Sequence, residues 1–399
     1  MESLESFRAL VGNARVVGIG ESSHYVREYT QVRHRMARTL VEELGFTLVT
    51  VESGFSEGLL VNRWVHGGDA PVREVAAEGM TYRFGEYPEM HELLTWVREV
   101  NAGGGRLTYA GLDLPADLAS LLPALDSLDG YLTDLDPDGD ALAGRARRLA
   151  EMYAGPHTMP AFAAYRAMAP ADRDQLTLLL AGLSARFDAM RPLYVRRTGA
   201  DRYETTRHEL RLAVQLDQML RTQSEAADAG QPAVVNVRDA AMAGTALRLL
   251  ERDGGRMVLL AANTHLQRVP MRLEQYELPV AGVHLADALG DDYVAVALTC
   301  DGGRTPSRRP APDAPGGVEL AGVELPEPVE GSIEAYLRTR PDGDQVTDLR
   351  PLRRAAGFGP RRIRVMDGYL DVPVAHAFDL VAALPKITPA TRVGPARPR

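Results

Sequence analysis

The sequence has a single cysteine, Cys300, among its 399 residues. One thiol excludes an intramolecular disulfide and cannot supply a cysteine-rich metal site. No apolar run approaches the ~20 residues that a membrane-spanning helix needs. The segment Met1–Phe7 is acidic where a signal peptide would be basic. These absences predict a cytoplasmic protein with no membrane partner.

The chain also lacks an excess of positive charge. Its net charge is −9 and its pI is near 5.6, whereas a nucleic-acid-binding surface needs a clustered basic patch. Hydrophobic residues make up 45% and charged residues 25%, which is ordinary for a soluble globular protein. The length allows one large domain or two modest ones. We therefore expect no nucleic-acid partner, and the oligomeric state stays open.

Several sequence motifs of known chemistry are missing. There is no G-x-S-x-G elbow of a serine hydrolase, no P-loop, no G-x-G-x-x-G and no H-E-x-x-H. We expect no cofactor. A divalent metal held by Glu21, His24, Glu52 and His265 is chemically possible, but their spacing does not require one.

What the chain does have is a set of four apolar, strand-like runs that each stop at polar residues. The runs are Arg15–Gly20 before Glu21 and His24, Thr47–Val51 before Glu52, Leu107–Leu112 before Asp113, and Met257–Asn263 before His265. Ligands of open α/β sheets bind outside the carboxyl ends of the strands. If the four runs are neighbouring parallel strands, these side chains line one crevice.

The order of patterns predicts an α/β protein with a mostly parallel open sheet flanked by helices. Strand and helix patterns alternate from residue 14 to about 125, including a helix over Val26–Leu44, and they resume after residue 230. Residues 116–230 read as helical. We expect a core of residues 1–115 and 231–399 with an inserted helical cap, 116–230, over the active-site cleft. The prolines and glycines of 301–330 predict an irregular surface stretch.

His24 is the strongest catalytic candidate. It lies three residues after Glu21 in a strand-to-helix turn. An ordinary imidazole titrates near neutrality and can accept a proton from water or a hydroxyl, and a nearby carboxylate would fix its tautomer. The alternative is a structural histidine beside a helix N-terminus.

Arg33 and Glu52 support the functional interpretation. Arg33 lies on the apolar stripe of its helix, where an unpaired charge would cost several kcal/mol, so it should meet a carboxylate such as Glu21 or Glu52. A structural ion pair explains it equally well. Glu52 ends an apolar run, where it can join His24 in acid–base chemistry. Asp113 can instead cap a following helix, and Asn263 can cap or orient His265.

At these residues the chain resembles the erythromycin esterase family, which includes succinoglycan biosynthesis-like proteins. The matching segments, in family order, are Gly20–His24, Arg33–Met36, Val51–Glu52, Leu60–Arg63, Trp96–Asn101, Gly111–Asp113, Val237–Met242, Asn263–His265 and Phe378–Asp379. They run from about residue 14 to 390. Each segment is weak alone, and the ordered set is specific.

The resemblance implies a deep polar cleft and hydrolysis of a macrolide lactone, in which a histidine activates water. His24 matches the family's general base, and Glu21, Arg33, Glu52 and His265 match its other polar site residues. The family usually has a second histidine where this chain has Ala262, and this difference is compatible with a changed substrate or a changed reaction. Further substrate-binding candidates are Ser23, Tyr82, Arg83, Phe84, Asp113 and Asn263.

Three functions remain open at this stage. The first is an esterase-like enzyme that acts on a bulky macrolide- or polyketide-like ester or lactone, with metal-independent acid–base chemistry. The second is a biosynthetic tailoring enzyme that uses the same cleft for cyclisation, elimination or group transfer. The third is a binding protein with a decayed site. In each case the partner is a small-molecule natural product.

Overall fold

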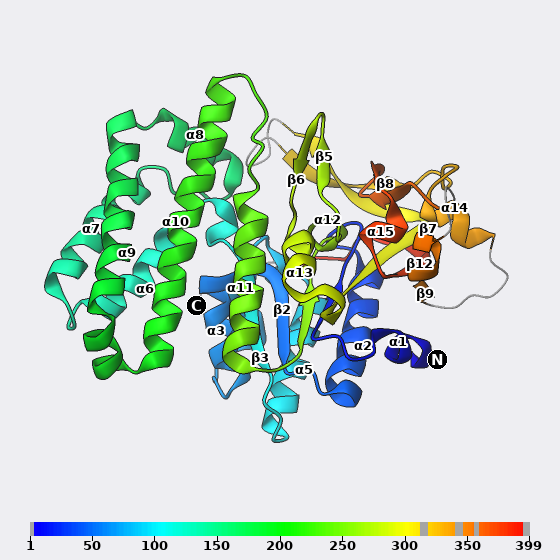
Figure 1. Ribbon diagram of the computed structural model, residues 1–399, viewed down its shortest axis with the longest axis horizontal. Helices are drawn as coiled ribbons and strands as arrows, with labels where there is room; N and C mark the ends of the chain where they lie inside the picture. Colours follow the sequence, from blue (N-terminus) through cyan, green and yellow to red (C-terminus); the bar gives the residue numbers. More distant parts are fainter. Residues whose placement is uncertain (1–3, 312–317, 340–345, 355–358, 394–399) are drawn as a thin grey trace.

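The fold is built on a mostly parallel sheet with a separate group of helices at one side (Figure 1). The structure is a computed structural model, and it describes residues 4–311, 318–339, 346–354 and 359–393. The strands of the main sheet are β1 (Val16–Ile19), β2 (Leu48–Gly54), β3 (Thr108–Asp113), β4 (Met257–Leu260), β7 (Tyr293–Pro310), β8 (Val318–Glu324), β9 (Thr347–Asp348) and β12 (Leu380–Ile387).

The four predicted runs form neighbouring parallel strands. The order in the sheet is β3-β2-β4-β1-β7-β12-β9, with β8 paired to β7. Strand β4 lies between β2 and β1, with Val258 paired to Val49 on one side and to Val17 on the other. Parallel pairing places the carboxyl ends of these strands at the same edge. The predicted fold class is therefore confirmed, and it explains how distant segments of the chain meet.

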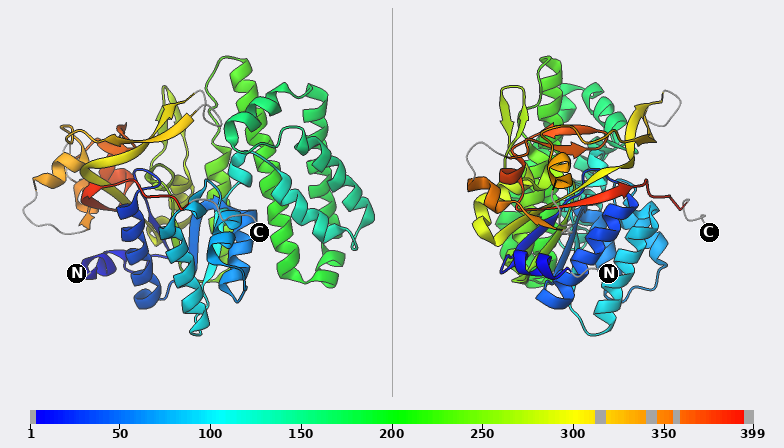
Figure 2. Two further views of the ribbon diagram at one scale, coloured as in Figure 1. Left: turned by 180° about the vertical axis from the view of Figure 1, so that it is seen from behind. Right: turned by 90° about the vertical axis from the view of Figure 1, so that its right-hand side faces the viewer.

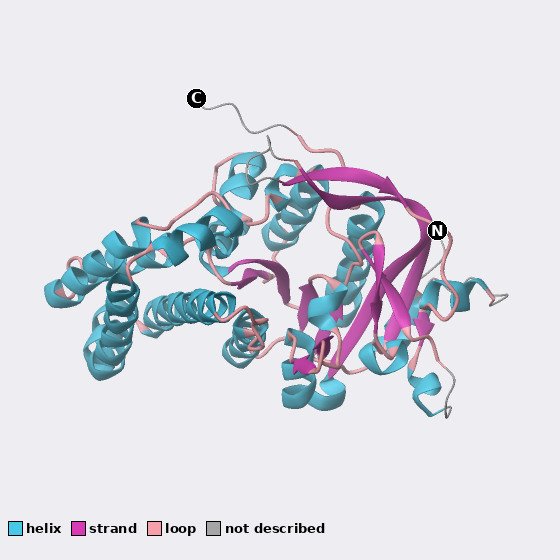
Figure 3. Ribbon diagram, turned by 90° about the horizontal axis from the view of Figure 1, so that it is seen from above, coloured by secondary structure: helices cyan, strands magenta, loops and turns pink. Residues whose placement is uncertain are grey.

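Helices cover both faces of the sheet (Figure 3). Successive strand residues point to opposite faces, so Val17 packs in one core and Val16 in the other. The first core includes α2 (Arg27–Leu44) and α5 (Pro88–Ala102), and the second includes α11 (Val237–Asp253) and α13 (Ala281–Leu289). Burial on both faces holds the strand ends in place.

The predicted helical region carries its own apolar core. Its helices are α6 (Leu122–Leu132), α7 (Pro137–Glu151), α8 (Thr158–Ala167), α9 (Pro170–Thr198) and α10 (Ala200–Asp228). Their buried leucines, alanines and aromatic residues pack against one another and against Phe55 and Leu114 of the sheet region. They lie to one side of the sheet in the left view of Figure 2. The boundaries of the cap at 116 and 230 stay a prediction.

Further elements complete the described parts of the chain. They are α1 (Glu5–Val11), α3 (Phe55–Val65), α4 (Val72–Gly79), α12 (Asn263–Leu266), β5 (Met271–Leu273), β6 (Tyr276–Leu278), α14 (Ile333–Arg338), β10 (Arg362–Val365), β11 (Gly368–Asp371) and α15 (Val374–Ala377). Among the helices described, none combines the length and the apolar character needed to cross a bilayer.

The prediction of an irregular stretch over 301–330 was wrong for 301–310 and 318–324, which are strands; 325–330 has no helix or strand, and 312–317 lies outside the described residues. Strand β7 continues to Pro310 and pairs antiparallel with β8, from Arg304 opposite Glu324 to Pro310 opposite Val318. The prolines and glycines suggested a loop, but an edge hairpin tolerates proline because only one side of each strand is paired. Gly303 adopts a φ of +104°, and a Cβ there would lie 2.2 Å from the Ile387 carbonyl oxygen. It lets the strand leave the main sheet.

Candidate active site

A tight turn between β1 and α2 carries Glu21 and His24. Strand β1 ends at Ile19, and the chain passes the open end of the sheet before α2 begins at Arg27. Gly20 is required here because a Cβ would lie 2.0 Å from the Asn263 side-chain oxygen. Tyr25 adopts a φ of 61° as the chain turns into the helix. The turn places His24 at the strand mouth with 28% of its side chain exposed.

Glu21, His24 and Arg33 form a chain of contacts. The His24 Nδ1 lies 2.8 Å from Glu21 Oε1, and Arg33 Nη1 lies 3.0 Å from the same oxygen. Glu21 and Arg33 are almost fully buried. A carboxylate oxygen accepts a hydrogen bond, so Nδ1 is the donor in this contact, and in that tautomer of the imidazole the lone pair is on Nε2. Of the two carboxylates expected as partners of Arg33, Glu21 is the one that it pairs with.

Glu52 lies on the other side of His24. Its Oε1 is 3.8 Å from His24 Nε2 and 3.2 Å from His265 Nε2, while its Oε2 accepts a hydrogen bond from the Ala262 backbone N–H at 2.8 Å. Burial alone would raise the pKa of Glu52, but His265, His24 and Arg238 outweigh it and hold the pKa well below its ordinary value. Glu52 is therefore a fixed negative charge near neutral pH.

His265 is held between two carboxylates. Its Nδ1 lies 2.7 Å from Asp239 Oδ1, and its Nε2 faces Glu52. Burial opposes the charged form, but Glu52 and Asp239 raise the pKa of His265 to about 10. The imidazole is therefore protonated at neutral pH, and both of its nitrogens are donors. His265 can stabilise negative charge, and it is a poor base.

Arg238 connects the ends of strands β2 and β3. It forms a fork with Asp113, with Nη2 at 2.6 Å from Oδ2, and its Nη2 also donates to Glu52 Oε1 at 2.9 Å. The Tyr82 hydroxyl donates to Asp113 at 2.8 Å, and the Tyr82 ring lies 5.3 Å from the guanidinium. Asp113 is fully buried. A buried carboxylate is poorly solvated, so Asp113 needs a cation beside it, and Arg238 is that cation.

We call the ionisable residues at this edge the strand-end cluster. It consists of Glu21, His24, Arg33, Glu52, Asp113, Arg238, Asp239 and His265. It includes every predicted catalytic residue. Arg238 and Asp239 were missed, although the family resemblance had singled out Val237–Met242. The signal was an Arg-Asp pair at a helix start, and sequence spacing does not show which strand end such a helix faces.

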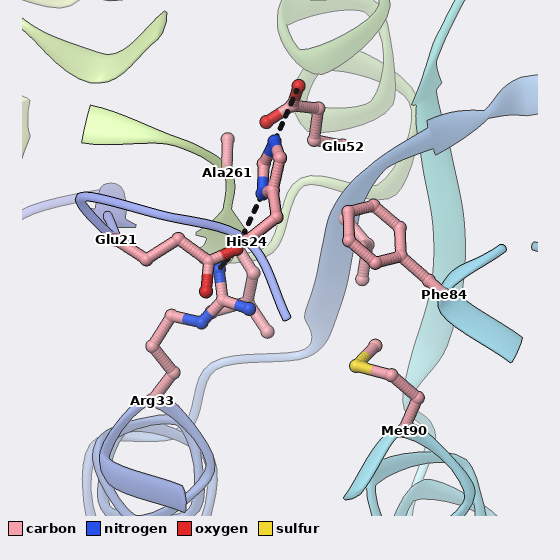
Figure 4. Close-up of a pocket in the computed structure, with 9 residues that line it drawn as sticks. Glu21, His24, Arg33, Glu52, Phe84, Met90 and Ala261 are labelled. Atoms are coloured by element: carbon pink, nitrogen blue, oxygen red, sulfur yellow. Dashed lines mark hydrogen bonds and ion pairs between the residues drawn. The ribbon is translucent and has the colours of Figure 1, made fainter. Parts of the chain in front are cut away.

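A cavity of about 10 Å³ lies beneath His24 (Figure 4). Phe84 packs edge-on against the imidazole, with 5.3 Å between ring centroids. The Glu21 and Arg33 side chains line the cavity, and the buried Glu21 Oε2 and Arg33 Nε make no hydrogen bond within the described residues. A space of this size fits a single water molecule. The family resemblance implies a deep cleft, and this cavity is too small to be one.

The other predicted substrate-binding residues are placed differently. Ser23 Oγ donates to backbone carbonyl oxygens of His24 and Pro306, at 3.3 and 3.4 Å. Arg83 is exposed and pairs with Glu86 at 2.7 Å. Both polar ends of the buried Asn263 side chain bond the Leu298 backbone. In this geometry Asn263 joins β7 to the start of α12. Substrate contacts by these residues stay a prediction.

The charge partners also bear on metal binding. In the ranges that the structure describes, no three His, Cys, Asp or Glu side chains are grouped so that they could hold one ion. Instead Arg33 and Arg238 occupy positions beside the carboxylates that sequence spacing had offered as ligands. The arrangement offers acid–base chemistry with its own side chains: the His24 imidazole, a carboxylate behind it and cationic donors nearby.

The fold and the site together define an α/β protein with a carboxylate–histidine pair at the carboxyl edge of a parallel sheet. The sequence profile described as erythromycin esterase matches residues 41–386, and the chain belongs to the erythromycin esterase family. The predicted family is thus confirmed.

Two curated relatives from Escherichia coli cover nearly the whole chain. Erythromycin esterase type II is 28% identical over 392 residues, which is 96% of this chain and 92% of the relative. Erythromycin esterase type I is 24% identical over 396 residues, 95% and 92% of the two chains. Both relatives are esterases by name.

Solved structures share the fold at lower identity. A histidine-to-asparagine mutant of the erythromycin esterase EreC in its open conformation superposes with a TM-score of 0.83, at 21% identity, over 98% of this chain and 96% of that one. A succinoglycan biosynthesis protein gives a TM-score of 0.75 at 19% identity, over 97% and 91%. These likenesses establish the architecture.

Proposed function

We propose that this protein hydrolyses an ester or lactone of a bulky macrolide- or polyketide-like natural product, with His24 as the base that activates water. The observation that supports this most directly is the contact series Arg33–Glu21–His24 at the strand ends. It holds the imidazole in one tautomer with Nε2 available. The names of the curated relatives support the substrate class.

In the proposed reaction, His24 Nε2 takes a proton from water as the water oxygen attacks the ester carbonyl carbon. The carbonyl oxygen then carries negative charge, and the nearby cations of Arg238 and His265 favour that charge. When the carbon–oxygen bond to the leaving alkoxide breaks, the imidazolium of His24 returns its proton to that alkoxide. The products are a carboxylic acid and an alcohol, and His24 is regenerated.

The position of Ser23 favours water over a serine nucleophile. Its hydroxyl hydrogen is directed to backbone carbonyl oxygens and not to the His24 imidazole. A serine nucleophile needs a base within hydrogen-bond reach of its oxygen. We therefore propose that no acyl-enzyme forms and that Ser23 supports the turn.

The cavity volume limits where the substrate lies. Drug-sized ligands occupy sites of roughly 300–1,000 Å³, whereas the cavity beside His24 holds about 10 Å³. Only the reacting ester needs to reach the exposed side of His24, and the rest of the substrate would lie outside this cavity. Phe84 packs against His24 and Tyr82 packs against Phe84, and these two aromatic residues are the substrate contacts that we propose.

The test is to incubate the protein with erythromycin and other macrolactones and to follow the products by mass spectrometry. We expect a product heavier than the substrate by one water. His24→Ala should lower kcat/KM by roughly 10²–10⁴-fold, the usual contribution of a general base. His66→Ala is the matched control: His66 is exposed and is not part of the strand-end cluster, so this variant should retain full activity.

The same assay separates this proposal from its competitors. A product of unchanged mass, or one lighter by one water, would indicate cyclisation or elimination in place of hydrolysis. Turnover that survives His24→Ala would contradict the assigned base. We further propose that the reaction needs no metal, so treatment with EDTA should leave the rate unchanged. Loss of activity that a divalent ion restores would overturn that part.

A further inference from the structure

A second and larger cavity lies among the helices, away from the strand ends. It has a volume of about 550 Å³ and is formed by α9, α10 and α11, which run side by side in Figure 1. The lining residues are Ser184, Asp188, Arg191, Tyr203, Glu204, Arg207, His208, Arg211, Val214 and Arg248. We call this cavity the arginine groove. It shares no residue with the strand-end cluster.

Positive charge exceeds negative charge along this groove. Four arginines line it, and two carboxylates face them. Arg207 pairs with Asp188 at 2.8 Å, while Arg191 and Arg248 share Glu204, at 3.3 and 3.8 Å. For Arg211, no ion-pair partner is found within the described part of the chain.

Among the residues that line the groove, four guanidinium groups and two carboxylates leave a net of two positive charges. Opposite charge brought into such a groove is attracted, most strongly at low ionic strength. The chain as a whole has a net charge of −9, so the sign of the charge in this groove is opposite to that of the whole molecule.

Two side chains of the groove have buried nitrogens without partners. His208 is 3% exposed, and its Nε2 lies 3.1 Å from Thr245 Oγ1. Because the Thr245 hydroxyl donates to the Ala241 carbonyl, Nε2 carries the proton in that contact. His208 Nδ1 and Arg248 Nη1 make no hydrogen bond to any residue that the structure describes. Unpaired buried polar atoms are uncommon and call for a physical explanation.

We propose that the arginine groove binds a small molecule that carries phosphate. Guanidinium groups match the oxygens of a phosphate in two-point contacts. The volume lies within the range of small-molecule sites, so the ligand would have a body larger than a lone phosphate ion. The proposal does not rest on the hydrolytic function, because no residue of the groove takes part in that reaction.

The local electrostatics support an anion as the missing component. Burial, followed by the positive charges of Arg248 and Arg211, lowers the pKa of His208 to about 3. Burial and the neighbouring Arg252 also lower the pKa of Arg248. Burial is the larger cause of both shifts, and the neighbouring arginines add to it. A phosphate bound beside Arg211 and Arg248 would offset their positive charges and so raise the pKa of the neighbouring His208.

Isothermal titration calorimetry with pyrophosphate, at low ionic strength and neutral pH, tests the proposal directly. We expect one site per chain, with affinity that falls as salt is added. Arg211→Gln and Arg248→Gln should each weaken binding by roughly tenfold, the effect of losing one charge-assisted hydrogen bond. Arg196→Gln removes an exposed arginine of α9 that does not line the groove, and it should leave the affinity unchanged.

A second measurement guards against variants that change affinity by altering the fold. NMR titration of the His208 ring should show its pKa rising when pyrophosphate is added to the wild-type protein. No binding by the wild type would overturn the proposal. Equal weakening by Arg196→Gln, or a His208 pKa that pyrophosphate does not move, would also overturn it, since either result places the anion elsewhere on the surface.

Discussion

The strand-end cluster and the arginine groove are both rich in charge, but they are built in different ways. In the cluster, strands and helix starts from distant parts of the sequence deliver buried carboxylates that Arg33, Arg238 and His265 neutralise. The remaining cavity is about 10 Å³. In the groove, three helices present exposed or half-buried arginines around about 550 Å³.

The difference shows how burial changes what an ion pair does. A charge removed from the buried cluster leaves its partners without compensation in a medium that solvates them poorly. A charge removed from the groove leaves partners that water reaches, as the 62% exposure of Asp188 shows. We therefore expect changes in the cluster to alter folding and chemistry, and changes in the groove to alter binding alone.

The largest contrast should come from Arg238→Gln. The change leaves Asp113, which is fully buried, and Glu52 without their shared guanidinium. Breaking a buried pair in this way costs about 3–5 kcal/mol of unfolding free energy. Urea unfolding followed by circular dichroism measures it, with Arg272→Gln on the exposed β5–β6 hairpin as control. A loss below about 1 kcal/mol would erase the contrast between the two regions.

A second test uses the pH dependence of stability. His265 has its pKa raised to about 10 by Glu52 and Asp239, against the effect of burial, and about 6.5 is expected for it in the unfolded chain. Its stabilisation is complete below about 6.5 and is lost as pH rises toward 10. The free-energy advantage of wild type over His265→Gln should therefore shrink across that range, by on the order of a few kcal/mol. A difference that stays constant with pH would contradict a protonated His265.

A third test separates positioning from stability within the cluster. Glu21→Gln removes the charge that holds His24 Nδ1–H, so we expect kcat to fall by roughly 10–100-fold with little change in KM. The change also leaves the buried Arg33, which is 5% exposed, without its carboxylate partner, and this should lower the free energy of unfolding. In the double variant Glu21→Gln, Arg33→Met the buried charge is gone, so stability should recover while kcat stays low. Recovery of both would mean that Glu21 only balances charge.

The strand ends were predictable because periodicity and chain order carry the information. The runs before Glu21, Glu52 and Asp113 are apolar on both faces, as buried parallel strands are. Glu21 follows shortly after β1 ends at Ile19, Glu52 lies near the end of β2 at Gly54, and Asp113 is the last residue of β3. Alternation of strands and helices then places those ends at one edge. The positions of His24 and His265 near one another follow from that topology.

Pairing between elements was not predictable in the same way. Arg238 does not follow a strand; it lies in the first turn of α11. Whether its side chain reaches Asp113 depends on how that helix crosses the sheet. The hairpin of β7 and β8 was missed because its prolines and glycines resemble a loop until the partner strand is known. The size of a cavity depends on side-chain packing, which no pattern of residue types records.

The smallest expected effect is that of Arg207→Gln in the groove. Arg207 makes a two-point contact with Asp188, with distances of 2.9 and 3.0 Å, yet Asp188 is 62% exposed. Exposed ion pairs contribute about 0–1 kcal/mol and are screened by salt. We expect a loss of stability in that range, reduced further in 0.5 M salt, measured by urea unfolding beside Arg238→Gln. A loss of several kcal/mol would show that the groove is held together by its charges, and the separation between a buried reaction site and a solvated binding site would no longer hold.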